Sequence, residues 1–146
     1  MKVQKSIDIK ATPEKIWPFF VEPEKVLQWC ITFKKYEYTN KQYNGVGTAI
    51  YIEEQAGGPL MKMNFEITDC IANEKLSLQM ISGTGVKAYK QDWSLEPIPS
   101  GSRFTFQEEV ILPFGVIGRL LGSIMEGSSA ATVDKMLARL KGLSET

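Results

Sequence analysis

The chain has 146 residues, with 17 basic and 17 acidic side chains, a net charge of zero and no histidine. This length predicts one domain over residues 1–146, because a second core would leave each half very small. The balanced, intermixed charges argue against a nucleic-acid partner, and the missing histidine excludes Ser-His-Asp and Cys-His catalysis and His-ligated metals.

Other absences narrow the functional class further. No apolar run reaches the ~18–20 residues of a membrane span, and residues 1–6 lack the apolar core of a signal peptide. Cys30 and Cys70 have no CxxC partner, which favours two free buried thiols over a disulfide or redox pair. No acidic or cysteine cluster has metal-ligand spacing. We therefore expect a cytoplasmic protein, monomeric or weakly dimeric, with no metal and no cofactor.

The N-terminal part of the chain predicts one strand followed by two short helices. Apolar and polar residues alternate over residues 3–9, as in a strand with one face in water. Thr12 fits a helix N-cap with Pro13 at the first helical position. Pro18 limits this helix to a few turns, and Pro23 opens the second helix.

The middle of the chain, from residue 33 to 112, predicts a succession of strands separated by turns. Glycine, proline and asparagine interrupt the apolar runs, as at Asn44-Gly45 and at Pro97–Gly101. Short turns between successive strands favour an antiparallel meander. The expected strands cover residues 33–38, 48–55, 60–70, 76–80, 86–96 and 104–110.

Residues 116–143 predict one long helix whose apolar side changes along its length. The apolar residues of its first half lie roughly 120–150° around the helix from those of its second half. The small residues 127–131 separate the halves, so either the helix bends near Gly127 or it is straight with its first half covered on two sides. Both alternatives leave room over the sheet, which either core side chains fill or a ligand occupies.

Several motifs occur along the chain in a fixed order. They are SIDIKATPEKIWPFF at residues 6–20, Trp29, NGVGTAI at 44–50, DWSLEPIPSGSRFTF at 92–106 and LPFGVIGRLLG at 112–122. Together with the order of the expected elements, they resemble the polyketide cyclase/dehydrase-like branch of the START/Bet v 1 (SRPBCC) superfamily. The resemblance implies an α+β helix-grip fold, in which a strongly bent antiparallel sheet of about seven strands wraps around the long C-terminal helix. It also implies a cavity between the sheet and that helix.

The residues expected to face this cavity are mostly aromatic residues, methionines and branched apolar residues. Such a surface suits an adaptable apolar pocket. In an ordinary core the same residues fill gaps, and plain core packing is the simpler interpretation of Trp17 and Trp93. The expected ligand-binding residues are Trp17, Met61, Met63, Phe65, Ile67, Leu78, Met80, Tyr89, Gln91, Trp93, Phe104, Phe106, Glu108, Leu120, Leu121, Ile124 and Met125.

Polar residues interrupt the apolar alternation of this inner face. Gln91 continues the phase of Tyr89, and Glu108 continues the phase of Phe106. If the phase holds, both side chains point inward, where burial raises the pKa of an unpaired carboxyl group. A bulge or strand end would instead turn Glu108 to solvent. Glu108 is the best candidate for a general acid or base, or for a partner of a ligand hydroxyl, and Glu53 is a weaker one.

These features lead to three functional hypotheses. The first is a carrier or sensor that binds a hydrophobic small molecule, such as a lipid or polyketide, in the cavity between sheet and helix. The second is a polyketide cyclase or dehydratase-type enzyme, in which Glu108 and Tyr89 act as acid–base groups without metal or histidine. The third is a protein-partner-binding module that carries no ligand.

Overall fold

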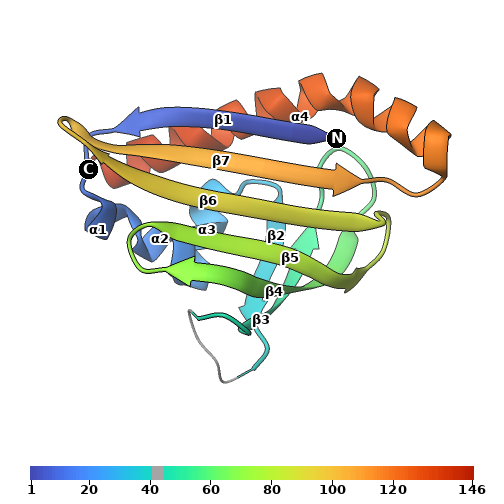
Figure 1. The fold of residues 1–146 in the computed structure, drawn as a ribbon, viewed down its shortest axis with the longest axis horizontal. Helices are drawn as coiled ribbons and strands as arrows, with labels where there is room; N and C mark the ends of the chain where they lie inside the picture. Colours follow the sequence, from blue (N-terminus) through green and yellow to red (C-terminus); the bar gives the residue numbers. More distant parts are fainter. Residues whose placement is uncertain (41–44) are drawn as a thin grey trace.

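One antiparallel sheet and one long helix dominate the fold (Figure 1). The structure is a computed structural model that describes residues 1–40 and 45–146, so the turn expected at Asn44 lies outside the described residues. The elements are β1 (Lys2–Ile9), α1 (Pro13–Ile16), α2 (Pro18–Val21), α3 (Pro23–Trp29), β2 (Phe33–Tyr38), β3 (Ala49–Glu54), β4 (Met61–Ile71), β5 (Lys75–Gly83), β6 (Ala88–Ile98), β7 (Gly101–Ile111) and α4 (Gly115–Ser144).

The seven strands lie in the order β1-β7-β6-β5-β4-β3-β2, and every neighbouring pair is antiparallel. Strands β2 to β7 follow one another as a meander, while β1 pairs with the last strand. Register shifts in the β2–β3 and β4–β5 pairs mark irregularities, which locally bend a strand. As a result, β2 and β3 run steeply across the direction of β6 and β7 (Figure 1). This bent sheet with its long C-terminal helix confirms the predicted helix-grip fold.

Three short helices connect β1 to β2, because the first of the two predicted helices is divided at Pro18. Thr12 caps α1 as expected, and its hydroxyl oxygen accepts a hydrogen bond from the Lys15 backbone N–H at 3.3 Å. Pro18 has no N–H with which to continue that helix, so it begins α2 instead. The short helices lie at the end of the sheet where the C-terminus also lies (Figure 1).

An aromatic core fills the end of the molecule that these short helices cover. Trp29 of α3 packs edge-on against Trp93 of β6 and Phe104 of β7, with ring centroids 5.0 and 5.5 Å apart. Its indole N–H donates to the Phe19 carbonyl at 2.9 Å. Aromatic pairs of this kind contribute roughly 0.5–1.5 kcal/mol beyond their buried area. The cluster therefore fixes α3 against the inner face of the sheet.

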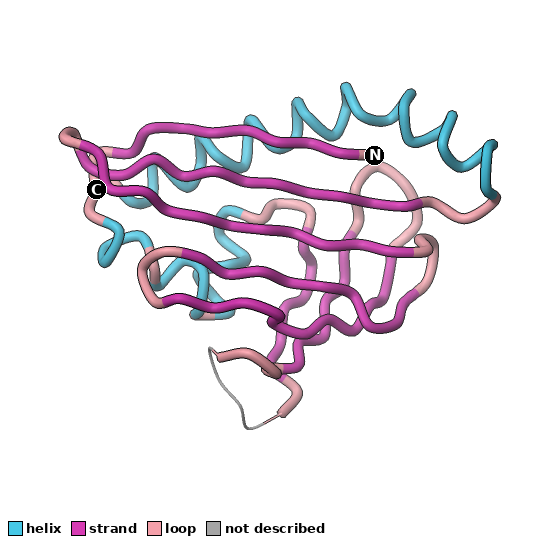
Figure 2. Tube along the Cα trace, viewed as in Figure 1, coloured by secondary structure: helices cyan, strands magenta, loops and turns pink. Residues whose placement is uncertain are grey.

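Helix α4 is a single helix that continues without interruption through Gly127 (Figure 2). Its inward-facing residues form one stripe in steps of three or four residues. Apart from Met125, the stripe has small residues in the first half of the helix and large apolar residues in the second, so no bend at Gly127 is needed. The stripe consists of Gly118, Gly122, Met125, Ser129, Val133, Met136, Leu137 and Leu140.

The prediction that Leu120, Leu121 and Ile124 face the cavity is wrong. Their side chains are 61, 46 and 77% exposed, because the inward stripe of this half of α4 passes through Gly118 and Gly122 instead. The large apolar residues thus cover the outer side of the helix. Even with them, neither α4 nor any other helix in the described part of the chain is long and apolar enough to cross a membrane.

Candidate functional site

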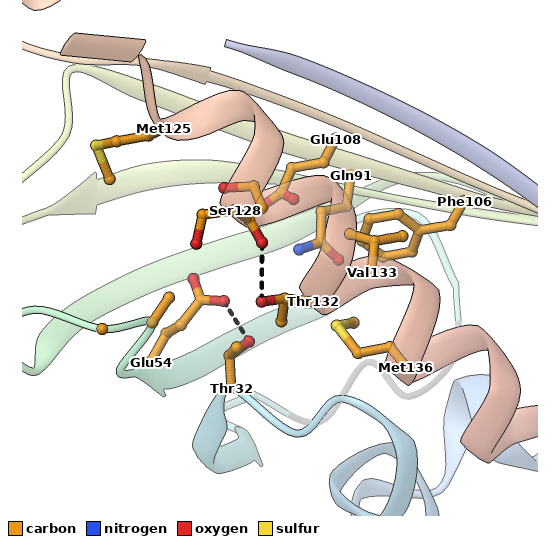
Figure 3. Close-up of a pocket in the computed structure, with 13 residues that line it drawn as sticks. Thr32, Glu54, Gln91, Phe106, Glu108, Met125, Ser128, Thr132, Val133 and Met136 are labelled. Carbon is orange, nitrogen blue, oxygen red and sulfur yellow. Dashed lines mark hydrogen bonds between the residues drawn. The ribbon is translucent and has the colours of Figure 1, made fainter. Parts of the chain in front are cut away.

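Two adjoining pockets lie between α4, the inner face of β6 and β7, and the end of β3. Their volumes are about 230 and 270 Å³, and they are named here the polar lobe and the apolar lobe. Both lobes are lined by Glu54, Ala56, Gly57, Glu108, Met125 and Ser129, so they adjoin, and together they are called the cavity. The polar lobe is completed by Thr32, Gln91, Phe106, Ser128, Thr132, Val133 and Met136 (Figure 3). The apolar lobe is completed by Met1, Gly58, Pro59, Met61, Gly85, Val86, Tyr89, Val110 and Leu112.

Small residues on two sides keep this cavity open. Ser128 and Ser129 stand on the cavity side of α4, where larger apolar residues would fill the space, and Ala56 and Gly57 do the same after β3. Gly57 has a φ of +81°, a backbone conformation that favours glycine. The sequence predicted room beside the small residues 127–131, and the two serines of that run line the polar lobe.

A chain of hydrogen bonds runs along the inner face of β6 to Glu108. The Trp93 indole N–H donates to Gln91 Oε1 at 2.9 Å, and the Gln91 amide donates to the Tyr89 hydroxyl at 2.9 Å. The Tyr89 hydroxyl in turn donates to Glu108 Oε1 at 2.7 Å. Because an indole N–H can only donate, the chain has one direction and ends on the Glu108 carboxyl group.

Burial changes the acidity of Glu108 and Tyr89. Removal from water is the main cause that raises the pKa of Glu108 to about 7; the charge of Glu54 raises it too, and the Tyr89 hydrogen bond acts against both. Burial, followed by the charges of Glu108 and Glu54, raises the pKa of the Tyr89 hydroxyl well above its ordinary value. At neutral pH, Glu108 can therefore take up or release a proton, whereas Tyr89 stays protonated and acts as a donor.

Glu54 is the second carboxyl group of the cavity. It ends β3 with only 5% of its surface exposed, and its Oε2 accepts a hydrogen bond from the Thr32 hydroxyl at 2.7 Å. Burial raises the pKa of Glu54, while hydrogen bonds from Thr32 and Tyr89 lower it. Figure 3 shows Glu54 and Glu108 reaching the cavity from opposite sides.

Within the described part of the chain, these two carboxyl groups have no cationic partner. No Lys or Arg side chain lines either lobe, and the ion pairs among the described residues involve other acids. The Met1 amino group, beside the apolar lobe, donates to the Val110 carbonyl at 2.8 Å. No group of three or more His, Cys, Asp or Glu side chains in residues 1–40 and 45–146 is placed to hold a metal ion. Such a pair of acids favours a shared proton or a hydrogen-bond donor from a ligand.

Only some of the predicted site residues reach the cavity. Glu108 and Gln91 point inward, as their strand phase predicted, and Tyr89, Phe106, Met61 and Met125 also line the cavity. The residues buried in the core that line neither lobe are Met63, Phe65, Ile67, Leu78, Trp93 and Phe104. Trp17 packs against Phe20 with ring centroids 5.5 Å apart, and Met80 borders a separate space between β5 and β6.

The sequence indicated Glu53 as a weaker acid–base candidate, but the structure buries its neighbour Glu54 instead. Tyr51 and Glu53 share the outer face of β3, and the Tyr51 hydroxyl donates to Glu53 Oε2 at 2.7 Å. Glu54 instead follows Ile50 and Ile52 on the buried face. The two isoleucines identify the buried face of β3. The tyrosine does not, because it is amphipathic and occurs on buried and exposed faces alike. Isolated hydroxyl residues such as Thr32 and Thr132 carry no periodic signal, and the sequence did not indicate them.

One curated relative matches part of this chain in sequence, and solved structures share its fold over nearly the whole chain. An uncharacterised protein from Mycobacterium tuberculosis is 23% identical over 111 residues, a match covering 69% of this chain and 60% of that relative's length. A solved structure, TTHA0849 from Thermus thermophilus, is 17% identical with a TM-score of 0.81, covering 99% of this chain and 97% of the other. A START superfamily protein from Mycobacterium smegmatis is 16% identical with a TM-score of 0.80 and the same coverage of 99% and 97%. At these identities the structural likeness shows the fold.

The family assignment comes from a match to the polyketide cyclase / dehydrase and lipid transport family, which spans residues 1–145. The match confirms the resemblance seen in the ordered motifs. Membership of this family implies a hydrophobic ligand-binding pocket. The chain belongs to the polyketide cyclase / dehydrase and lipid transport family.

Proposed function

We propose that this protein binds a hydrophobic small molecule of lipid or polyketide type in the two-lobed cavity, and acts as its carrier or sensor. The observation that carries the proposal is the junction of an apolar lobe and a polar lobe at Glu54 and Glu108. Together the lobes fall within the roughly 300–1,000 Å³ of small-molecule sites. An apolar body fits the first lobe, and one polar group fits beside the carboxyl and hydroxyl groups of the second.

The wall of the apolar lobe supports an adaptable binding surface. Met61 and Met125 line it together with Val86, Val110 and Leu112. Methionine is flexible and polarisable, so it adjusts to ligands of different shape. The side-chain donors of Tyr89, Gln91 and Trp93 on β6 are already hydrogen-bonded to one another and to Glu108. A ligand can therefore enter without breaking the hydrogen bonds of the wall.

Binding of the neutral dye Nile red tests this proposal. We expect saturable fluorescence enhancement with the wild-type protein, and competition by any molecule that native mass spectrometry finds bound to it. Ser129→Leu places a larger side chain into both lobes and is expected to weaken dye affinity at least about tenfold, a loss of about 1.4 kcal/mol. Ser123→Leu, on the exposed side of α4, is the matched control and should keep wild-type affinity.

The exposed apolar side of α4 offers the dye an alternative site, which a third variant examines. Ile124→Ser removes a side chain that is 77% exposed there. Circular dichroism verifies that all three variants keep the fold. If Ile124→Ser weakens dye binding and Ser129→Leu does not, the dye binds the surface of α4 and the proposal is wrong.

A second candidate function is acid–base catalysis of the cyclase or dehydratase type, favoured by the pKa of about 7 at Glu108. A group that titrates near neutral pH can both donate and accept a proton during turnover. The Tyr89 hydroxyl already donates to Glu108, so the proton that polarises a carbonyl group would come from a protonated Glu108. In such an enzyme Glu108→Gln lowers turnover by about 10²–10⁴, whereas a carrier has no turnover to lose and keeps its affinity for the neutral dye.

A further inference from the structure

We propose that the cavity selects a ligand whose polar end is a protonated amine, held between Glu54 and Glu108, with its apolar body in the apolar lobe. This inference rests on the proposed function and adds the chemical class of the ligand to it. It places fatty acids and other carboxylates among the molecules that the cavity rejects.

The two acidic side chains meet the same space from different strands. Glu54 ends β3 and Glu108 lies on β7, and both line both lobes. Each accepts a hydrogen bond from a neutral hydroxyl group, from Thr32 and from Tyr89 respectively. A carboxylate has about four acceptor positions, so both acids keep acceptor capacity for a donor inside the cavity.

No side chain of the described cavity wall neutralises these acids. The titratable side chains that line the cavity are Glu54, Glu108 and Tyr89, and Met1, which carries the N-terminal amino group, lines the apolar lobe. The amino group donates to the Val110 carbonyl, and α4 contributes only uncharged side chains to the wall. Only 5% of the surface of Glu54 is exposed. Water therefore solvates the charge of this carboxylate only weakly.

A bound ammonium group supplies a positive charge between the two acids, which no side chain of the described wall supplies. Hydrogen bonds between charged groups are roughly twice as strong as neutral ones. Two neighbouring carboxyl groups without a counter-charge retain a proton instead, in agreement with the raised pKa values of Glu108 and Glu54. A ligand carboxylate would bring a third acid into the same space, so it is expected to bind poorly.

Three ligands with one apolar body test the selectivity. They are 2-(1-naphthyl)ethylamine, 2-(1-naphthyl)ethanol and 1-naphthylacetate, measured by isothermal titration calorimetry near neutral pH. We expect the amine to bind at least about tenfold more tightly than the alcohol, and at least about 100-fold more tightly than the carboxylate. These factors correspond to about 1.4 and 2.7 kcal/mol.

Variants of the acid pair separate recognition of the amine from a structural role. Glu54→Gln and Glu108→Gln should each weaken amine binding about tenfold and leave alcohol binding nearly unchanged. Glu53→Gln and Glu109→Gln, next to these acids in sequence, are the matched controls and should keep the full preference for the amine. A purely structural role would weaken all three ligands equally.

Proton release on binding is a second measurement. A purely structural role of the two acids would not change it. An ammonium group favours the ionised carboxyl pair, so amine binding should release a proton near neutral pH, and alcohol binding should not. Titrations in buffers of different ionisation enthalpy measure this release. Glu108→Gln is expected to reduce it.

The failures of the inference and of the proposed function are distinguishable. If the alcohol and Nile red bind but the amine shows no preference, or if the carboxylate binds as tightly as the amine, the inference is wrong and the proposed function stands. If the amine preference survives in both glutamine variants, the inference is also wrong. If neither the dye nor any of the three ligands binds, both are overturned.

Discussion

Replacing Glu108 by glutamine tests whether this partly buried acid destabilises the fold at neutral pH. Glutamine keeps an acceptor oxygen for the Tyr89 hydroxyl but cannot ionise. The pKa of Glu108 is about 7 in the fold against an ordinary 4.5, an interval that corresponds to roughly 3 kcal/mol. Because the folded state has the higher pKa, it binds more protons in this window, and stability falls as pH rises through it. We expect the wild type to lose about 3 kcal/mol relative to Glu108→Gln across the window.

Urea denaturation of both proteins at intervals from about pH 4.5 to about pH 8 measures this difference. Comparing the two at each pH cancels the titration of the shared acids that do not interact with Glu108; Glu54 does interact with it. In thermal melts the same difference appears as about 2–4 °C for each kcal/mol. Glu109→Gln controls for the loss of one negative charge on the same strand. A difference between wild type and Glu108→Gln that stays constant across the pH range would refute the reasoning.

The two halves of α4 should respond differently to substitution. Leu137 is 2% exposed, and Leu137→Ala is expected to lower the free energy of unfolding by about 2–5 kcal/mol. Leu120 is 61% exposed, and Leu120→Ala should change it by less than about 0.5 kcal/mol. Equal losses in urea denaturation would contradict the orientation of the helix. A Cβ at Gly118 would lie 2.1 Å from the Pro113 carbonyl oxygen, so Gly118→Ala should destabilise by about 1–3 kcal/mol. Gly127→Ala has no atom within 4 Å of its Cβ and should stabilise by about 0.5–1 kcal/mol; melting temperatures that shift in the same direction would count against this difference.

Strand phase made one member of the acid pair predictable and hid the other. Glu108 lies on an 11-residue strand, where Phe104 and Phe106 fix the inner face before it. β3 has only 6 residues, and its tyrosine allowed either phase, so the sequence favoured Glu53 over Glu54. Since successive side chains alternate, one misplaced residue in a short strand moves every side chain to the other face.

Helix α4 shows why large apolar residues can indicate the wrong face. Leu120, Leu121 and Ile124 dominate the hydrophobic pattern of its first half, yet the contact with the rest of the protein runs through Gly118 and Gly122. Glycines add almost nothing to an apolar pattern, although they permit the closest approach between elements. The sequence predicted the length of the helix and the space beside its small residues. The side that meets the sheet depends on tertiary contacts that no local pattern records.

The acid pair, of which Glu54 is buried and Glu108 partly buried, lies on the same cavity wall as the small residues of α4. Both features are expected to lower stability. Acids buried without a counter-charge are unfavourable, and space beside Ser128 and Ser129 forfeits packing contacts. Substitutions that remove such features are common and stabilising, and the usual loss is function. Two unfavourable features that meet in one place therefore argue for a bound ligand. We accordingly expect Glu108→Gln to gain stability at neutral pH and to lose the preference for the amine. A Glu108→Gln protein that gained stability but kept the preference for the amine would contradict this argument.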